Sequence, residues 1–128
     1  MMNKDERVLA AGAATIKAFR EKRAAEEKKL RIGRIAEARA ALPSLVEEIR
    51  RIDPGIRTIL LFGSLARGEP RSARFDIDLA VDSDKYLQLV SWALDQSFAV
   101  DVVCLDDLDP AFRASILEYG KVLYERAR

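Results

Sequence analysis

Residues 58–67 read TILLFGSLAR, and this stretch decides how the C-terminal part of the chain folds. Its first five residues form a continuous apolar run of strand length. The run begins shortly after an Asp-Pro-Gly turn signal at 53–55 and ends in Gly63 and Ser64. This pattern predicts a buried strand that leaves through a glycine-serine turn, after which a helix can start.

The following sixty residues contain two more strand patterns and two helical ones. Residues 76–81, DIDLAV, alternate polar and apolar side chains, and residues 99–103, AVDVV, have the same character. A helix is expected between them over residues 84–95. A second helix is expected from Asp109-Pro110 to Gly120, followed by a short edge strand at 122–124. Two tyrosines of this C-terminal part, Tyr119 and Tyr124, are expected to pack in the core or at a sheet edge.

The N-terminal part consists almost entirely of helix-forming residues. From residue 35 onward the apolar residues recur at helical spacing: Ile35, Ala38, Leu42, Leu45, Val46, Ile49 and Ile52. Pro43 is expected to kink or restart this helix, because proline lacks an N–H donor. The preceding stretch is only weakly amphipathic, and a helix of that kind is marginal without packing. We therefore expect it to lean on a partner chain or on a second copy of itself.

Composition excludes several classes of chemistry. The 128 residues suit one compact domain, and no apolar run approaches the roughly 18 residues of a membrane span. The chain has no histidine and one cysteine, which excludes His-dependent nucleophilic catalysis, His-ligated zinc and an internal disulfide framework. The N-terminus lacks the apolar core of a signal peptide, so a cytoplasmic protein without membrane contact is expected.

Charge divides the chain into a basic and an acidic part. Residues 1–51 carry 13 Lys and Arg against 8 Asp and Glu, whereas residues 52–128 carry 9 against 13. The basic part is interpreted first as a solvated helix surface. It could also dock an acidic protein or nucleic acid, of which nucleic acid is less favoured because no aromatic residues interleave the charges.

The glycine-serine turn carries the first chemical signal. Glycine allows a backbone to approach a phosphate closely, and free N–H groups at a helix start attract anions. Ser64 adds a hydroxyl, and Arg67 can add a charge-assisted contact. Taken alone, a Gly-Ser pair after a strand is most often only a turn.

Three aspartates carry the second signal. Asp76 and Asp78 lie two residues apart in a strand, so both point to the same face, and Asp101 presents a third carboxylate from another strand. Like charges gathered in this way need a compensating cation or must titrate upward. Oxygen-only ligands suit magnesium or manganese, which take further ligands from substrate phosphates. The combination of the turn and the three carboxylates predicts a metal-dependent nucleotide site, where the third carboxylate can accept the proton of an attacking hydroxyl.

With these motifs in place, residues from about 42 to 124 resemble the minimal nucleotidyltransferases of the DNA polymerase β-like superfamily. The resemblance rests on LFGSLARGE at 61–69, DIDLAV at 76–81, AVDVVCL at 99–105 and ILEYGKVLYER at 116–126. It implies an α+β fold with a small mixed sheet and flanking helices. It divides the chain into a helical extension, 1–41, for partner binding or dimerisation, and a nucleotidyltransferase domain, 42–128.

The resemblance also implies roles for the site residues. Gly63 and Ser64 hold the nucleoside triphosphate, Asp76 and Asp78 bind two Mg²⁺ ions, and Asp101 completes the set and orients the attacking hydroxyl. The family transfers a nucleoside monophosphate from ATP or a related triphosphate. This chain departs from the family in having eleven residues rather than ten between Ser64 and Asp76, and Phe75 where serine is usual.

The resemblance further implies a partner. Stand-alone members often pair with a HEPN-type toxin, a small helical ribonuclease, and act as the antitoxin by adenylylating a tyrosine of the toxin. The leading hypothesis is therefore Mg-dependent transfer of AMP from ATP to such a partner, held through the N-terminal helix as a hetero-complex or a homo-oligomer. The alternatives are a catalytically weak antitoxin that neutralises its partner by binding, and a nucleotidyltransferase acting on RNA or a small molecule.

Overall fold

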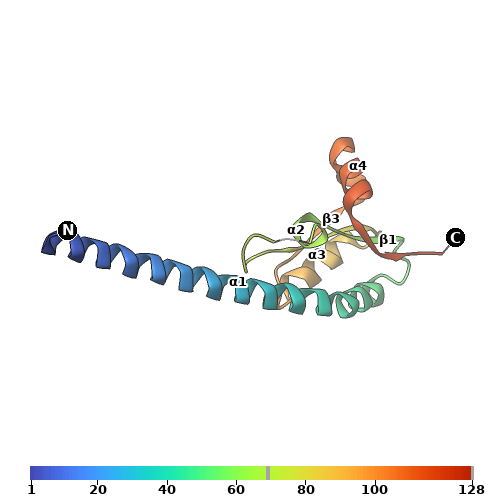
Figure 1. Cartoon of the computed structure of the whole chain (residues 1–128). Coiled ribbons are helices and arrows are strands. Elements are labelled where there is room, and N and C mark those ends of the chain that lie inside the picture. The colour runs from blue at the N-terminus through green and yellow to red at the C-terminus, as the bar shows by residue number, and fades with distance from the viewer. Residues whose placement is uncertain (69, 128) are drawn as a thin grey trace.

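The chain forms a four-stranded sheet with helices on both faces and one very long N-terminal helix (Figure 1). A computed structural model describes residues 1–68 and 70–127. The elements, in chain order, are α1 (Lys4–Ile52), β1 (Thr58–Phe62), α2 (Gly63–Ala66), β2 (Ile77–Asp82), α3 (Tyr86–Leu94), β3 (Val100–Cys104), a 3₁₀ turn η1 (Leu105–Asp107), α4 (Pro110–Tyr119) and β4 (Lys121–Glu125). The α+β class expected from the sequence is confirmed.

The order of the strands places β1 and β2 at the centre of the sheet, in the sequence β3-β2-β1-β4. β1 runs antiparallel to both β2 and β4, whereas β2 and β3 are parallel, so the sheet is mixed as expected. A parallel pair needs a crossover connection, and α3 supplies it between β2 and β3. The short C-terminal strand lies at the edge of the sheet, as the sequence predicted.

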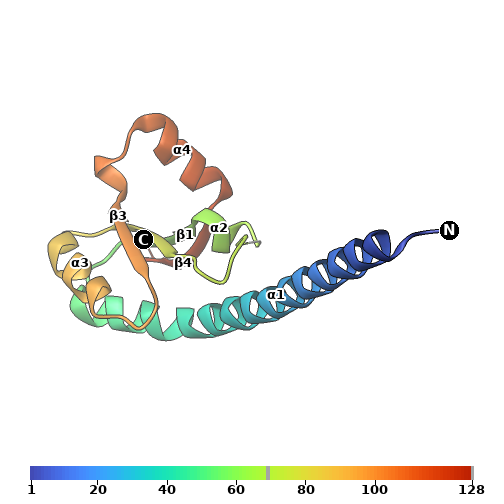
Figure 2. The same cartoon turned by 90° about the vertical axis from the view of Figure 1, so that its left-hand side faces the viewer.

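Apolar side chains on one face of the sheet form the main core. In Figure 2, α1 and α3 lie on this side of the sheet and α4 lies on the other. Every second residue of β1 and β2 faces α1 and α3. Together with residues of the helices, of β3 and of the adjoining turns, these residues form the main cluster: Ala38, Leu45, Ile49, Ile56, Ile59, Leu61, Leu65, Ala66, Ile77, Leu79, Val81, Leu89, Ala93 and Val102. The opposite face carries a smaller cluster under α4, made of Leu60, Ala80, Leu105 and Ile116. The alternation of a half-buried strand therefore leaves positions 78 and 101 on the α4 side.

Helix α1 continues through Pro43, so the expected restart at this residue is wrong. Proline in a helix interior removes one backbone hydrogen bond and costs about 3 kcal/mol. Ala38, Leu45 and Ile49, on both sides of the proline, are buried against the sheet. Their burial stabilises helix on both sides of the proline and offsets the lost hydrogen bond.

The first part of α1 projects beyond the sheet as an arm, which we define as residues 4–34 (Figure 1). Asn3 and Glu6 form a capping box that starts the helix. Apolar residues of the arm such as Ile16 and Phe19 are more than half exposed. The helix runs without a break across residues 41 and 42, so the division into an extension and a domain stays a prediction. Over the described part of the chain, no helix has a stretch both long and apolar enough for a membrane span.

Candidate active site

The glycine-serine turn lies directly against the second strand. Gly63 directly follows β1 and has a φ of 75°, a conformation that residues with a Cβ rarely adopt. A Cβ at this position would also overlap the carboxylate of Asp78. The register explains the contact, because Phe62 is paired with Asp78 across β1 and β2. Backbone conformation and space therefore both require glycine beside this carboxylate.

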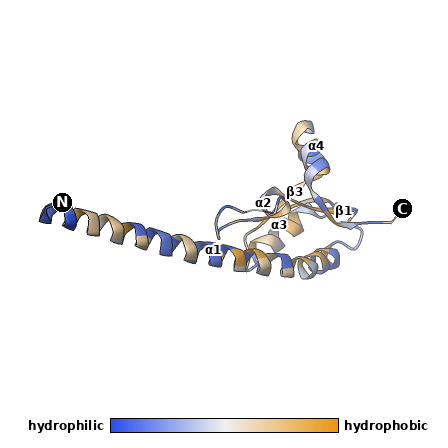
Figure 3. Cartoon of the chain, viewed as in Figure 1, coloured by the Kyte–Doolittle hydropathy of each residue, from blue (hydrophilic) through white to orange (hydrophobic). Residues whose placement is uncertain are grey.

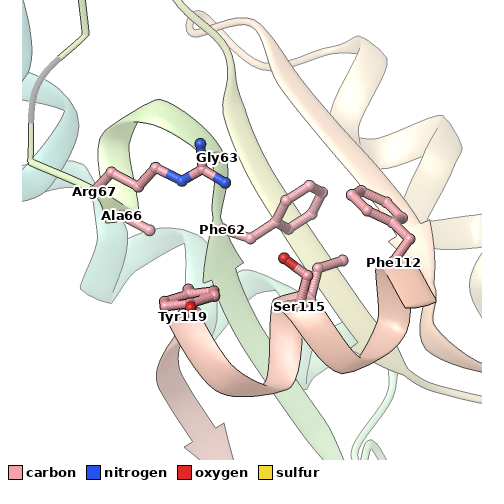
Figure 4. A pocket seen from close by; sticks show the side chains of 9 residues that line it. Phe62, Gly63, Ala66, Arg67, Phe112, Ser115 and Tyr119 are labelled. Atoms are coloured by element: carbon pink, nitrogen blue, oxygen red, sulfur yellow. The ribbon is translucent and has the colours of Figure 1, made fainter. Parts of the chain in front are cut away.

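The residues after the turn form the single helical turn α2. Ser64 is partly buried in it, and the backbone N–H of Arg67 donates to the carbonyl of Gly63 at 3.2 Å. The Arg67 side chain is exposed and lies beside the turn in Figure 4. The three residues predicted to hold a nucleotide therefore share one turn at the end of β1.

The three predicted carboxylates gather at the same end of the sheet. Asp78 and Asp101 are direct partners in the parallel register of β2 and β3, so they lie side by side on the face that carries α4. Asp76 lies one residue before β2 begins. Asp78 is partly buried, whereas the other two side chains are exposed to solvent.

Electrostatics supports this grouping. The pKa of Asp78 is raised from 3.8 to about 6, first by desolvation and then by the negative charges of Asp101 and Asp76. Both neighbours raise the pKa, which means that both lie close enough to repel the Asp78 carboxylate. A cation held among these groups would remove the repulsion.

The donor set fits magnesium by its chemistry. All the donors are carboxylate oxygens, which Mg²⁺ prefers, and the ion ordinarily takes only one or two protein carboxylates and completes its shell with water and substrate phosphates. Within residues 1–68 and 70–127, no three Asp, Glu, Cys or His side chains are already closed around a common point.

A pocket of about 160 Å³ lies between the turn and α4 (Figure 4). Phe62, Gly63 and Arg67 line one side, and Phe112 and Tyr119 line the other. The rings of Phe62 and Phe112 meet edge to face, with centroids 5.9 Å apart. The pocket gives an apolar surface with aromatic rings next to the glycine-serine turn.

Sequence reasoning missed the contribution of α4 to this pocket. Tyr119 was expected in the core or at a sheet edge, which is wrong, because its side chain is 64% exposed at the end of α4. Ser115 and Phe112, on the same helix, also line the pocket. The Asp109-Pro110 start predicted the helix correctly, but no local signal gives its angle to the sheet.

Phe75, which replaces the usual serine, is partly buried and packs against the main core. The connection from α2 to β2 reaches α1, where Arg31 donates a hydrogen bond of 3.0 Å to the carbonyl of Arg71. Phe75 and the connection from α2 to β2 therefore both lie on the α1 side of the sheet, outside the pocket under α4.

Comparisons with known proteins agree with this geometry. The family model described as "Polymerase beta, Nucleotidyltransferase" matches residues 45–128. Two solved structures have the same fold, and each alignment covers 66% of this chain and 73% of the other. One, described as a toxin-antitoxin with AMP-PNP, has a TM-score of 0.55 at 25% identity. The other, described as a toxin-antitoxin MntA-HpeT mutant, has a TM-score of 0.56 at 22% identity.

The search of curated proteins gave no match. The family model alone covers well over half of the chain and includes the turn and all three carboxylates. The glycine required beside Asp78, the paired carboxylates and this match lead to one conclusion. The chain belongs to the polymerase β family of nucleotidyltransferases.

Proposed function

We propose that this chain transfers AMP from ATP to a hydroxyl, most simply that of a tyrosine, on a partner protein. The observation that carries the proposal is the packing of Gly63 against Asp78, with Asp101 beside it in register. This arrangement brings the glycine-serine turn, which would bind the phosphates, next to the paired carboxylates. The similarity to a toxin-antitoxin structure described with AMP-PNP, an analogue of ATP, supports ATP as the donor.

Each site residue has a role in this proposal. Gly63 and Ser64, with Arg67, would hold the triphosphate, and Asp76 and Asp78 would hold Mg²⁺. Two bound ions would stabilise the attacking and leaving oxygens. The Asp101 carboxylate would accept a hydrogen bond from the acceptor hydroxyl and take its proton. The hydroxyl oxygen then bonds to the α-phosphorus while the bond to pyrophosphate breaks.

The proposed partner is a HEPN-type toxin, which this chain would neutralise as the antitoxin. Two similar folds come from structures described as toxin-antitoxin complexes. The projecting arm supports a protein partner, because its apolar side chains have no cover among the described residues of this chain.

The test is transfer of label from α-labelled ATP to the protein encoded beside this chain, in the presence of Mg²⁺. The wild-type chain should label that neighbour, and Asp76→Ala should abolish the label. Asp95→Ala, an exposed aspartate at the end of α3, is the matched control and should label as the wild type does. Absence of label with the wild-type chain would contradict the catalytic proposal.

A second candidate is an antitoxin that works by binding alone. The observation that favours it is the length and exposure of the arm, which contributes no residue to the carboxylate site. This candidate predicts that Asp78→Ala still neutralises the partner, while a chain without residues 1–30 does not. The leading proposal predicts the opposite outcome for Asp78→Ala.

A further inference from the structure

One side of the arm carries a regular stripe of exposed residues. Its members recur at alternating intervals of three and four residues, which is the heptad pattern of helices that pair along a seam. We define the stripe by these members: Leu9, Gly12, Ile16, Phe19, Arg23, Glu26, Leu30 and Gly33. The apolar side chains among them are all more than half exposed. The stripe therefore has the pattern of a helix-pairing seam, but no second helix of the described residues 1–68 and 70–127 covers it.

Two hollows lie along the stripe. One, of about 360 Å³, surrounds Gly33 and is lined also by Leu30 and Glu37. A Cβ on Gly33 would meet no atom within 4 Å, so the space above this residue is open. The other hollow, of about 540 Å³, lies beside Phe19 and Ile16. In a pair of helices, side chains of one helix enter holes between residues three and four apart on the other, and both hollows are bounded in this way.

Two charged residues occupy the middle of the stripe. Within residues 1–68 and 70–127, neither Arg23 nor Glu26 forms an ion pair at 4.0 Å or less. The guanidinium carbon of Arg23 lies 5.8 Å from the centroid of the Phe19 ring, so this charge stays next to the seam. Charges in a helix seam are costly unless the facing helix brings the opposite charge. These two residues therefore restrict which helix can cover the stripe.

A second copy of the chain in antiparallel orientation meets this restriction. When Arg23 of one copy faces Glu26 of the other, the two-fold symmetry of the pair places the remaining Glu26 against the remaining Arg23. A parallel pair would instead set Arg23 against Arg23 and Glu26 against Glu26. An antiparallel pair shifted by one heptad would set Glu26 against Ile16 or Leu30. One orientation and one register therefore neutralise both charges.

The apolar residues fit together in the same register. Phe19 of each copy would face Leu30 of the other, and Ile16 would face Gly33. Ile16 would then enter the hollow around Gly33, and Leu30 would enter the hollow beside Phe19. Charge and shape therefore select the same arrangement, although each depends on different residues.

The positions beside the seam moderate the affinity. Arg20 would approach Glu27 of the other copy, but Glu27 already has an ion-pair partner in its own chain. Lys22 and Lys29 of opposite copies would approach each other and repel. We therefore expect a dimer that dissociates on dilution. Because denaturant also separates such a pair, unfolding measured at low concentration reports on the single chain, in which Ile16 is exposed.

We infer that the arm pairs through the stripe with a second copy of this chain, antiparallel and centred on two reciprocal contacts between Arg23 and Glu26. The inference goes beyond the proposed function and does not rest on it. Since the sheet lies at one end of α1, the two sheets would lie at opposite ends of the paired arms (Figure 1). Lys17, Glu21 and Lys28 lie on the other side of α1 by its 3.6-residue period and stay available to a different protein.

Sedimentation of the full-length chain over a range of concentrations tests the pairing. The average mass of the wild-type protein should rise from that of one chain to that of two. Arg23→Glu and Glu26→Arg, which each bring like charges together, should raise the dissociation constant roughly tenfold or more. Lys17→Glu makes the same charge change on the other side of α1 and should dimerise as the wild type does. All three positions are exposed, and helical circular dichroism checks that each variant folds.

A double exchange tests the orientation. The variant with both Arg23→Glu and Glu26→Arg again brings opposite charges together in the antiparallel pair and should regain the wild-type dissociation constant. In a parallel pair the double exchange would leave like charges facing each other, and the single substitutions would weaken nothing.

Three outcomes would overturn the inference. They are a wild-type chain that stays single at the highest concentration at which it is soluble, equal dimerisation of the Arg23→Glu and Lys17→Glu variants, and a double exchange that does not restore pairing. A single chain that binds only the acceptor protein through the stripe belongs to the first outcome and assigns the stripe to that protein. Transfer of label from ATP is measured separately, so dimerisation without transfer would contradict only the catalytic proposal.

Discussion

The two ends of α1 are one continuous helix in very different surroundings. Ile49, near its C-terminus, is fully buried under the sheet, while Ile16, in the arm, is 55% exposed. Figure 3 shows the difference as a patchwork of hydrophilic and hydrophobic residues along the arm and a more hydrophobic stretch under the sheet. Helix-forming residues and a capping box support the arm, which has little burial of its own, whereas burial against β1 and β2 makes the other end part of the fold.

The sheet region and the arm also differ in the function proposed for each, which is catalysis for the sheet region and partner binding for the arm. The acidic C-terminal part places three carboxylates at one end of the sheet, and the basic arm extends beyond it. Changes in the sheet region should therefore alter the rate of transfer or the stability of the sheet, whereas changes in the arm should alter neither of these. Three matched pairs of substitutions, and one substitution followed against pH, test that difference.

The largest expected effect is on the rate of transfer. Asp101→Asn keeps the shape of the side chain but cannot accept a proton, so the rate should fall about 10²–10⁴-fold while the melting temperature changes little. Glu26→Gln, the same kind of change in the arm, should leave the rate unaltered. Single-turnover assays with labelled ATP measure both variants, and equal rates for Asp101→Asn and the wild type would remove Asp101 from the mechanism.

The next effect is on stability. Ile49→Ala should lower the free energy of unfolding by about 3 kcal/mol, because it leaves a cavity in a closed core. Ile16→Ala, at an exposed position, should change it by less than about 0.5 kcal/mol. Urea denaturation of the two variants tests this directly. A comparable loss for Ile16→Ala would show that the arm is buried in solution, as it would be in a dimer.

The third comparison is between two glycine substitutions, one of which should lower the stability of the chain while the other should raise it. Gly63→Ala should destabilise the chain by about 2 kcal/mol, because alanine is strained at positive φ and would overlap Asp78. Gly12→Ala has open space around its new Cβ within a helix and should stabilise the arm by up to about 1 kcal/mol. Thermal melts and helical circular dichroism report the two effects. A neutral Gly63→Ala would contradict the close contact with Asp78.

The smallest effect depends on pH. Because the pKa of Asp78 is raised to about 6 in the folded chain, the native state loses stability as pH rises and this group ionises. Asp78→Asn should therefore be the more stable protein near neutral pH in EDTA, by about 1 kcal/mol after allowing for solvent screening. The advantage should vanish below about pH 4, where Asp78 is protonated in both states. An advantage that persists in acid would exclude this explanation.

The strands could be predicted because their patterns are local. The apolar run of β1, the alternation of β2 and the Asp109-Pro110 start of α4 each depend on a few consecutive residues. The two-residue period of a strand also predicted a shared face for Asp76 and Asp78, although Asp76 lies one residue before β2 begins. The candidate site residues and their roles stay predictions.

The errors concern features that depend on distant neighbours. Pro43 was expected to kink or restart α1, and no restart occurs, because residues on both sides are buried against a sheet that lies later in the chain. Tyr119 was expected to be packed, and its exposure follows from the angle of α4 to the sheet. The environments of Pro43 and Tyr119 depend on segments far away in the sequence, so neither can be deduced from adjacent residues.

By itself, the sequence determined the elements of this protein and the residues able to do chemistry, because hydrogen bonding and side-chain alternation act over short distances along the chain. Only the tertiary structure decided that Asp78 and Asp101 are neighbours across β2 and β3 and that Gly63 must be a glycine. These depend on strand order and helix packing, which are set by burial of apolar surface between segments far apart in sequence.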